Sequence, residues 1–203
     1  MLVVALDGDV HKTMVLSRLP RSYFNRGPVP LARDLLGKIL LVDGVGGIIT
    51  ETEAYDGAND PAAHTYNGES PRNRSMFQRA GTLYVYRIHR SFCMNAVARR
   101  KGQGSGVLLR AITPTHGLEL IEKRRGGKPK KIWCNGPGKL TQALAITLAD
   151  DGTDFLSKKS RIQVLDSGIE LRDEQIEVTA RIGISKAKDF PWRFVLSHPL
   201  PGS

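Results

Sequence analysis

The sequence predicts an α+β fold, a compact single domain built around an antiparallel or mixed β-sheet. Its extended segments follow one another through hairpin turns, with few helical segments between them. Its two Gly-rich stretches lack the setting of a βαβ unit, which argues against a Rossmann or P-loop site. The length of 203 residues suits one domain. We expect that domain over residues 18–200, after an N-terminal segment, residues 1–17, whose order the sequence does not define, and before a frayed end at Leu200–Ser203.

The first half of the chain predicts one helix and two strands. Leucines at helical spacing between Pro30 and Leu41 indicate a helix that gives way to a strand. Gly44–Gly47 is a hairpin turn signal, and Ile48–Tyr55 alternates as a strand does. A loop that contains Pro, Asn and Gly follows from Asp56 to Arg74.

The second half predicts further strands and two helices. Two strands joined by a turn at His89–Ser91 form a hairpin. Thr113 followed by Pro114 is typical of an N-cap and first turn, which predicts a helix that runs to Arg125. The strands are expected at Thr82–Ile88, Phe92–Val97, Gly106–Ile112, Ile162–Leu165 and Trp192–Leu196, and the second helix at Lys139–Leu148.

The charge balance points to a polyanionic partner. Thirty Lys and Arg against twenty Asp and Glu give a net charge of +10, which favours nucleic acid over a protein that is basic for solubility alone. Cys93 and Cys134 are too few for a disulfide framework, so we expect reduced thiols in or near the core. No apolar run reaches bilayer length, and Met1–Leu6 has no basic region before it, so we expect a cytoplasmic protein without a membrane partner.

Several polar and aromatic residues are candidates for chemistry. In an extended strand, Glu51, Glu53 and Tyr55 share one face. If that face is inward, the carboxylates must be paired or functional, and if it is outward, they are solvated. Arg110 follows an apolar run and needs a carboxylate partner, for which Glu53 and Glu51 are available; the pair could also be a salt bridge that only joins two strands.

The predicted hairpin carries Tyr84 and Tyr86 and ends in His89 and Arg90. Such a ribbon is suited to a DNA groove, or it is a core hairpin whose tyrosines bond locally. His64 alone would more often be a structural residue than a catalyst.

A set of motifs resembles the alkyladenine (methylpurine) DNA glycosylase family, in the family's order, over about residues 18–197. The motifs are Glu51–Tyr55, Ala62–His64, Pro71–Arg74, Met76–Phe77, Gly81–Tyr86, Phe92–Asn95, Val107–Arg110, Asn135–Leu140, Gln142–Leu144 and Arg181–Gly183. The resemblance implies a compact domain around a curved, mainly antiparallel sheet, with a protruding β-hairpin that enters DNA. It also implies a monofunctional enzyme of base-excision repair that flips alkylated or deaminated purines out of double-stranded DNA and hydrolyses their N-glycosidic bond.

The resemblance also implies roles for individual residues. Glu53 is similar to the general base, Arg110 to the residue that holds the attacking water, and the carbonyl of Ile182 to the third contact of that water. Tyr55 and Tyr86 are similar to the aromatic walls around the base, and His64 to the residue that closes the pocket. Asn95 is similar to the residue that rejects guanine through its exocyclic amino group.

The hairpin tip departs from the family pattern. The animal enzyme has a tyrosine wedge where this chain has His89, and a histidine there is similar to bacterial members, which favours a bacterial-type member. The turn between Tyr86 and Asn95 is also one residue shorter. His89 and Arg90 are the candidates for contact with DNA. No metal or organic cofactor is required by this chemistry, and we expect a monomer associated with the bacterial nucleoid.

Two other functions remain open from the sequence. A glycosylase with lyase activity needs an amine nucleophile, and Lys139 is the candidate. The family fold is also similar to the C-terminal domain of methionyl-tRNA formyltransferases, so a non-catalytic nucleic-acid-binding module is the second alternative. Such a module needs no carboxylate at Glu53.

Overall fold

The computed structural model describes residues 2–4 and 14–197. The strands are β1 (Leu2–Val4), β2 (Met14–Arg18), β3 (Ile39–Val42), β4 (Val45–Asp56), β5 (Leu83–Ile88), β6 (Ser91–Ala98), β7 (Ser105–His116), β8 (Ile162–Asp166), β9 (Ile176–Thr179) and β10 (Arg193–Leu196). The helices are α1 (Arg21–Phe24), α2 (Pro28–Asp34), α3 (Leu118–Arg125) and α4 (Pro137–Ala143).

The strands form one sheet with the order β1-β2-β8-β3-β4-β7-β6-β5. Strand β10 joins the same edge of β4 beyond β3, and β9 pairs with β10. Each of these pairings is antiparallel. The predicted α+β fold with a mainly antiparallel sheet is therefore confirmed.

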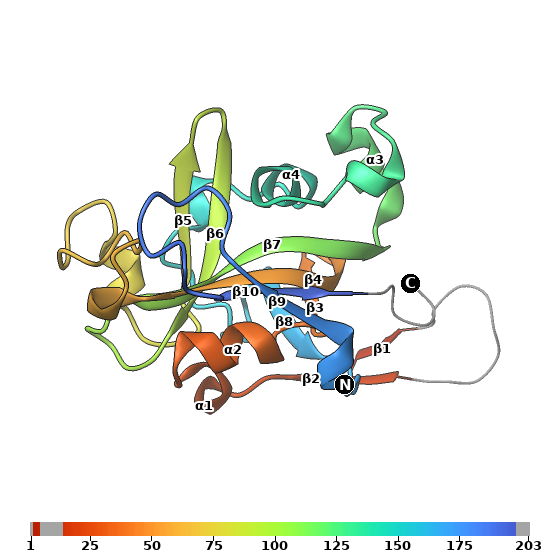
Figure 1. Cartoon of the computed structure of the whole chain (residues 1–203). Helices are drawn as coiled ribbons and strands as arrows, with labels where there is room; N and C mark the ends of the chain where they lie inside the picture. The colour runs from red at the N-terminus through yellow and green to blue at the C-terminus, as the bar shows by residue number, and fades with distance from the viewer. Residues whose placement is uncertain (1, 5–13, 198–203) are drawn as a thin grey trace.

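Helices cover both faces of the sheet. In Figure 1, α1 and α2 lie below the central strands, whereas α3, α4 and the β5–β6 hairpin rise above them. The lower layer is apolar: Leu31 and Leu35 on the α2 side and Ile49 and Ala54 on β4 are all fully buried. Burying each large aliphatic side chain of this kind contributes about 1.5–3 kcal/mol. This packing holds β4 and β7 in position and thereby orients the side chains on their upper face.

The hairpin before β4 turns earlier than the glycine pattern suggests. The turn lies at Asp43–Gly44, and Gly46 and Gly47 are already part of β4. A Cβ atom on Gly46 would lie 1.9 Å from the carbonyl oxygen of Leu40, and one on Gly47 would lie 2.0 Å from that of Thr113. The glycines therefore serve the close approach of neighbouring backbones and do not form the turn.

The helix predicted from Thr113 is wrong at its start. Strand β7 continues through this point, with Thr113 opposite Ile48 and Pro114 opposite Gly47, and α3 begins only after Gly117. Pro114 has no N–H to donate, but it lies at an irregularity in the register, where a strand tolerates proline. Long-range pairing with β4 thus overrides a local helix signal.

The other helix and strand boundaries differ less from the predicted ones. Helix α2 begins at Pro28, two residues before the expected start, and α4 ends at Ala143, because Ala145 adopts a left-handed φ of 53°. The β5–β6 turn is shorter than expected, since Ser91 already pairs with Ile88. Strand β9 was not predicted.

Part of the N-terminal segment joins the sheet. Strand β2 pairs with β8, and β1 pairs with β2, so strand structure crosses the expected boundary at residue 18. The expected frayed end at Leu200–Ser203 lies outside the described residues.

Candidate active site

The register of the sheet aligns one residue from each of four neighbouring strands in a single row. Tyr84 on β5 is opposite Asn95 on β6, Asn95 is opposite Leu108 on β7, and Leu108 is opposite Glu53 on β4. Paired residues of an antiparallel sheet point to the same face. The upper face of the sheet therefore brings together side chains that lie up to 55 positions apart in the chain.

The two faces of β4 separate chemistry from packing. Thr52 and Ala54 are fully buried towards the helical layer below, where the Thr52 hydroxyl donates to the carbonyl of Ala32 at 2.7 Å. Glu51, Glu53 and Tyr55 lie on the opposite face. Of the two alternatives left by the sequence, the inward one holds for Glu53, whose side chain is 0% exposed.

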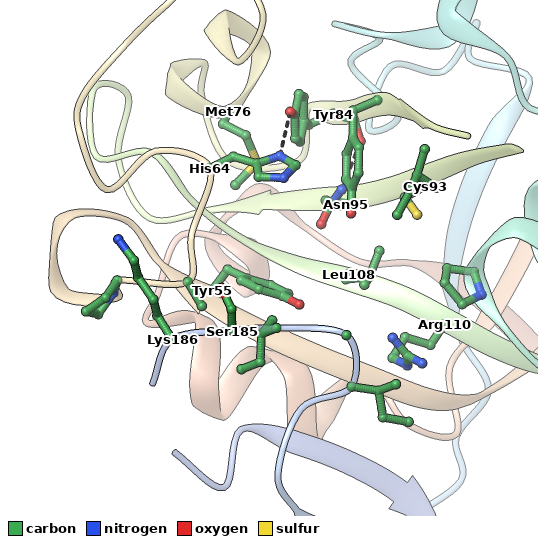
Figure 2. Close-up of a pocket in the computed structure, with 18 residues that line it drawn as sticks. Tyr55, His64, Met76, Tyr84, Cys93, Asn95, Leu108, Arg110, Ser185 and Lys186 are labelled. Carbon is green, nitrogen blue, oxygen red and sulfur yellow. Dashed lines mark hydrogen bonds between the residues drawn. The ribbon is translucent and has the colours of Figure 1, made fainter. Parts of the chain in front are cut away.

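A cavity of about 470 Å³ opens on this upper face. In Figure 2, Tyr55 lies on one side, His64 and Tyr84 lie on the opposite side, and Asn95 and Leu108 lie between them. A slot of this size that combines aromatic walls with polar side chains is typical of a small-molecule or base site. The sequence-predicted residues that line it are Tyr55, His64, Tyr86, Asn95, Arg110 and Ile182.

Glu53 lies beneath this lining and accepts three contacts. Its Oε1 atom accepts from the backbone N–H of Ile182 at 2.8 Å and lies 3.2 Å from Nη1 of Arg110. Its Oε2 atom accepts from the Tyr55 hydroxyl at 2.8 Å. A carboxylate offers about four acceptor positions, so Oε2 keeps one for a further donor such as water.

Glu51 holds Arg110 from the other side. Its Oε1 atom accepts from Nε of Arg110 and from Nε of Arg193, each at 2.7 Å. Burial acts to raise the pKa of Glu51, but hydrogen bonds from Arg193 and Arg110 outweigh it, so this pKa lies below its usual value. Burial likewise acts to lower the pKa of Arg110, and the carboxylates of Glu53 and Glu51 outweigh it and raise this pKa. Arg110 is therefore a permanent cation.

The β4–β7 register is irregular where Arg110 lies. Ile49 pairs with Ile112 and Thr52 with Leu109, but between these pairs Glu51 is opposite Ala111, and Arg110 has no regular partner. Irregular positions of this kind re-aim a side chain beside a site. Here the guanidinium reaches both carboxylates.

The aromatic wall is a packed group of three rings. His64 and Tyr86 have centroids 4.5 Å apart at 73°, and Tyr84 stacks on Tyr86 at 5.5 Å. Nδ1 of His64 lies 3.1 Å from the Tyr84 hydroxyl. Burial, helped by the charge of Arg72, lowers the pKa of His64, so its imidazole is neutral at pH 7. Burial also raises the pKa of Tyr84 to about 12.

Two further residues of the site region escaped the interpretation of the sequence. Arg181 and Asp60 form a fully buried pair, with Nη1–Oδ2 and Nη2–Oδ1 distances of 2.5 and 2.9 Å. The Arg181 guanidinium lies 4.7 Å from the ring centre of Tyr55 and 5.1 Å from that of Trp192. Arg181 lay inside a recognised motif, but no signal in the sequence connected it with Asp60.

The hairpin tip and Lys139 lie outside the cavity lining. His89 and Arg90 are exposed at the two-residue turn, where His89 adopts a left-handed φ of 50°. Ile88, beside them, lines the cavity and is 43% exposed. The Lys139 ammonium donates to the Asn135 side chain at 2.9 Å.

The described part of the chain offers neither a cluster of metal ligands nor a membrane span. Within residues 2–4 and 14–197, no group of three His, Cys, Asp or Glu side chains is placed to hold a metal ion. Cys93 and Cys134 are buried free thiols, as expected. In the same residues no helix has the length and apolar character to cross a bilayer.

Comparison with known proteins gives a consistent result. The sequence profile described as methylpurine-DNA glycosylase (MPG) matches residues 22–199. A Rhodopseudomonas palustris protein, provisionally named 3-methyladenine DNA glycosylase, is 45% identical over 194 residues, covering 90% of this chain and 89% of the relative. A Bradyrhizobium diazoefficiens protein of the same name is 43% identical over 194 residues, covering 90% and 92%. One from Agrobacterium fabrum is 45% identical over 181 residues, covering 88% of each chain.

Proposed function

The chain belongs to the methylpurine-DNA glycosylase family, and from this premise we propose that it is a monofunctional DNA-repair glycosylase. It extrudes a damaged purine from double-stranded DNA and hydrolyses the bond between base and sugar with an activated water. The observation that carries the proposal is the buried carboxylate of Glu53 directly beneath an aromatic cavity, in contact with Arg110 and Tyr55 of the cavity lining. We propose that it acts on a bacterial chromosome, which the similarity to bacterial relatives supports.

The cavity accounts for the capture of the base. A base cannot be reached inside the duplex, and extruding it costs a few kcal/mol, less for a damaged pair. Stacking between Tyr55 and the rings of Tyr86 and His64 offsets this cost by about 1–3 kcal/mol per base. N3- and N7-alkylated purines are cationic, so electron-rich rings favour them further. Alkylated purines are therefore the substrates that this slot suits best.

Asn95 supplies a means of rejecting guanine. It is 4% exposed on the cavity floor, and its Nδ2 donates to the carbonyl of Tyr84 at 3.3 Å. Because this bond and the packing hold the side chain in place, it cannot move aside for an extra exocyclic amino group. The proposal is that steric exclusion at Asn95 separates adenine-like lesions from normal guanine.

Glu53 supplies the general base. Departure of the purine leaves positive charge on the sugar, as in other glycoside hydrolyses. An ionised Glu53 both stabilises this charge and accepts the proton of the attacking water. Nη1 of the Arg110 cation lies 3.2 Å from Oε1 of Glu53, and we propose that Arg110 orients the water. Because Glu53 is closed to bulk solvent, that water must enter through the cavity floor.

Water, and not an amine, is the proposed nucleophile. Lys139 donates to Asn135 and is absent from the cavity lining, and a lyase would need an amine of lowered pKa at the sugar. The product is then an intact strand with an abasic site. The hairpin ending in His89 and Arg90 is proposed to fill the gap left by the extruded nucleotide, and the enzyme to act as a monomer without a cofactor.

The test is single-turnover release of methylated purines from alkylated duplex DNA, followed by gel analysis with and without hot alkali. We expect strand cleavage only after alkali. Cleavage without alkali, or a borohydride-trapped adduct, would assign the lyase mechanism instead.

A variant separates the enzyme from a binding module. Glu53→Gln should keep its affinity for DNA and lose base release by about 10²–10⁴-fold, the usual contribution of a general base. The control is Glu177→Gln, an exposed carboxylate on β9, which should release bases at the wild-type rate. DNA that the wild-type protein binds without releasing any purine would overturn the enzymatic proposal and favour the binding module.

A further inference from the structure

The segment Lys123–Lys131 is the most basic part of the surface outside the cavity. Six of its nine residues are Lys or Arg, and none is acidic. In the described residues none of these six side chains forms an ion pair. Unneutralised like charges repel one another and destabilise a fold. A cluster of this density without carboxylates therefore needs an explanation other than packing.

The backbone of this basic segment is anchored. Nη1 of Arg124 donates to the carbonyl of Ala143 at 3.0 Å, and the Gln142 amide donates to the carbonyl of Arg124 at 3.0 Å. The indole of Trp133, which is 6% exposed, donates to the carbonyl of Lys128 at 2.6 Å. These bonds secure the segment to α4 and to the core, whereas the side chains of Lys123, Lys128, Lys130 and Lys131 are exposed.

The basic segment lies on the same side of the sheet as the hairpin tip. In Figure 1, α3 and the chain that follows it rise above the sheet to about the level of the β5–β6 turn, with α4 between them. Helix α4 lies against the hairpin: the Thr141 hydroxyl donates to the carbonyl of Phe92 at 2.9 Å, and Gly138 comes so near that a Cβ built on it would lie 2.9 Å from that of Ser91. A ligand resting on the hairpin therefore extends over α4 towards the basic segment.

The spacing suits a DNA duplex. Packed elements lie about 10 Å apart, so two steps, from hairpin to α4 and from α4 to α3, span about 20 Å. The base pairs of B-DNA are about 3.4 Å apart, so this distance corresponds to about six pairs. The charge and the spacing both fit a straight arm of double helix that leaves the site.

We propose that the basic segment is a second DNA-binding surface, which binds backbone phosphates of one duplex arm about six base pairs from the extruded nucleotide. The inference rests on the proposed function, because it takes the cavity as the position of that nucleotide. The binding is independent of sequence and adds affinity through release of condensed counterions. It leaves the chemistry at Glu53 unchanged.

The first test is the salt dependence of DNA affinity. The triple variant Lys128→Ser, Lys130→Ser, Lys131→Ser removes three exposed charges, and for each phosphate that is no longer neutralised the slope of log Kd against log salt should fall by about 0.9. The defect of this variant relative to wild type should then shrink between 50 and 200 mM salt by about 3-fold for one phosphate and by about 40-fold for three. Single-turnover base release at saturating enzyme should equal that of the wild type.

A matched control removes three exposed lysines elsewhere. Lys101 follows the end of β6 that is remote from the hairpin tip, and Lys158 and Lys159 lie in the turn before β8. The variant Lys101→Ser, Lys158→Ser, Lys159→Ser changes net charge equally and should keep the wild-type slope. Equal slopes in both triple variants would assign the effect to net charge and overturn the proposed surface.

The second test uses the wild-type chain and needs no variant to fold. Lesion-containing duplexes are shortened one base pair at a time on either side of the lesion. We expect affinity to fall on one side only, when that arm becomes shorter than about six base pairs, and the basic-segment variant to lose this length dependence. Symmetrical length dependence, or an unchanged salt slope, overturns the inference even where purine release persists. Absence of purine release in the wild type, with the slope change intact, would instead refute only the proposed function.

Discussion

The buried Arg181–Asp60 pair makes a quantitative prediction about the site and its stability. Both side chains are 0% exposed, and Asp60 also accepts from the backbone N–H of Ala62 at 3.0 Å, in the loop that leads to His64. Asp60→Asn leaves the Arg181 cation buried without a countercharge. Breaking a buried pair in this way costs about 3–5 kcal/mol. For a chain of this size about 1 kcal/mol shifts Tm by 2–4 °C, so we expect a decrease of about 6–20 °C.

The assay is thermal unfolding of matched variants, followed by base release well below each Tm. The control is Asp173→Asn, which removes an exposed partner of Arg33 and should leave Tm unchanged, because surface pairs contribute little. The double variant Asp60→Leu, Arg181→Met replaces the pair by apolar groups of similar size. It should regain most of the stability that Asp60→Asn removes.

Base release should not follow stability. Arg181 packs against the rings of Tyr55 and Trp192, so the double variant removes a support of the cavity wall and should stay slow although it is stable. A Tm of Asp60→Asn within 2 °C of the Asp173→Asn control would refute the reasoning about buried charge. A double variant that is both stable and fully active would refute the positioning role of Arg181.

Three further predictions concern the carboxylate cluster and its chemistry. Because hydrogen bonds from Arg193 and Arg110 hold the pKa of Glu51 below its usual 4.5, its contribution to stability is present above that pH and is lost as pH falls through the lowered value. The difference in Tm between wild type and Glu51→Gln should thus be constant above about pH 5 and shrink below it. A Tm difference that grows as the pH falls would contradict a lowered pKa of Glu51. Tyr55→Phe removes one hydrogen-bond donor to Glu53 but keeps the ring that stacks on the base. It should therefore lower the rate of single-turnover base release, while its DNA affinity stays within about 2-fold of the wild-type value. An equal decrease of rate and affinity would assign Tyr55 to binding alone. Treatment with a chelator should leave base release unchanged, and restoration of a lost activity by added Zn²⁺ or Mg²⁺ would reveal a metal requirement.

The sequence predicted the carboxylate face well because a strand has a simple geometry. A period of two is enough to place Glu51, Glu53 and Tyr55 together, and an arginine after an apolar run needs a carboxylate. Whether that face pointed inward was not decidable, because it depends on Arg110 and on the backbone of Ile182, which come from later parts of the chain. The sequence likewise left open which carboxylate pairs with Arg110, and in the structure Arg110 contacts both Glu51 and Glu53.

The errors occurred where long-range pairing overrides local preference. Thr113-Pro114 has the local chemistry of a helix start, but pairing with β4 keeps it in a strand. Gly46 and Gly47 have the composition of a turn, but neighbouring carbonyls occupy the space that side chains would need. Strand β9 is short, with Glu177 and Val178 exposed, so it has no apolar alternation to reveal it.

The irregularity around Arg110 has a consequence for how chains of this fold can vary in length. Three steps lead from Ile49 to Thr52 on β4, and three from Leu109 to Ile112 on β7, so the two disturbances cancel and every later pair stays in phase. An inserted or deleted residue in either strand would put the remaining pairs out of phase and turn Glu53 or Leu108 to the opposite face. Length changes are therefore tolerated better in turns that join strands than within this ladder. The β5–β6 turn lies outside the β4–β7 ladder, so a change of one residue there leaves the alignment of Glu53, Arg110 and Tyr55 undisturbed.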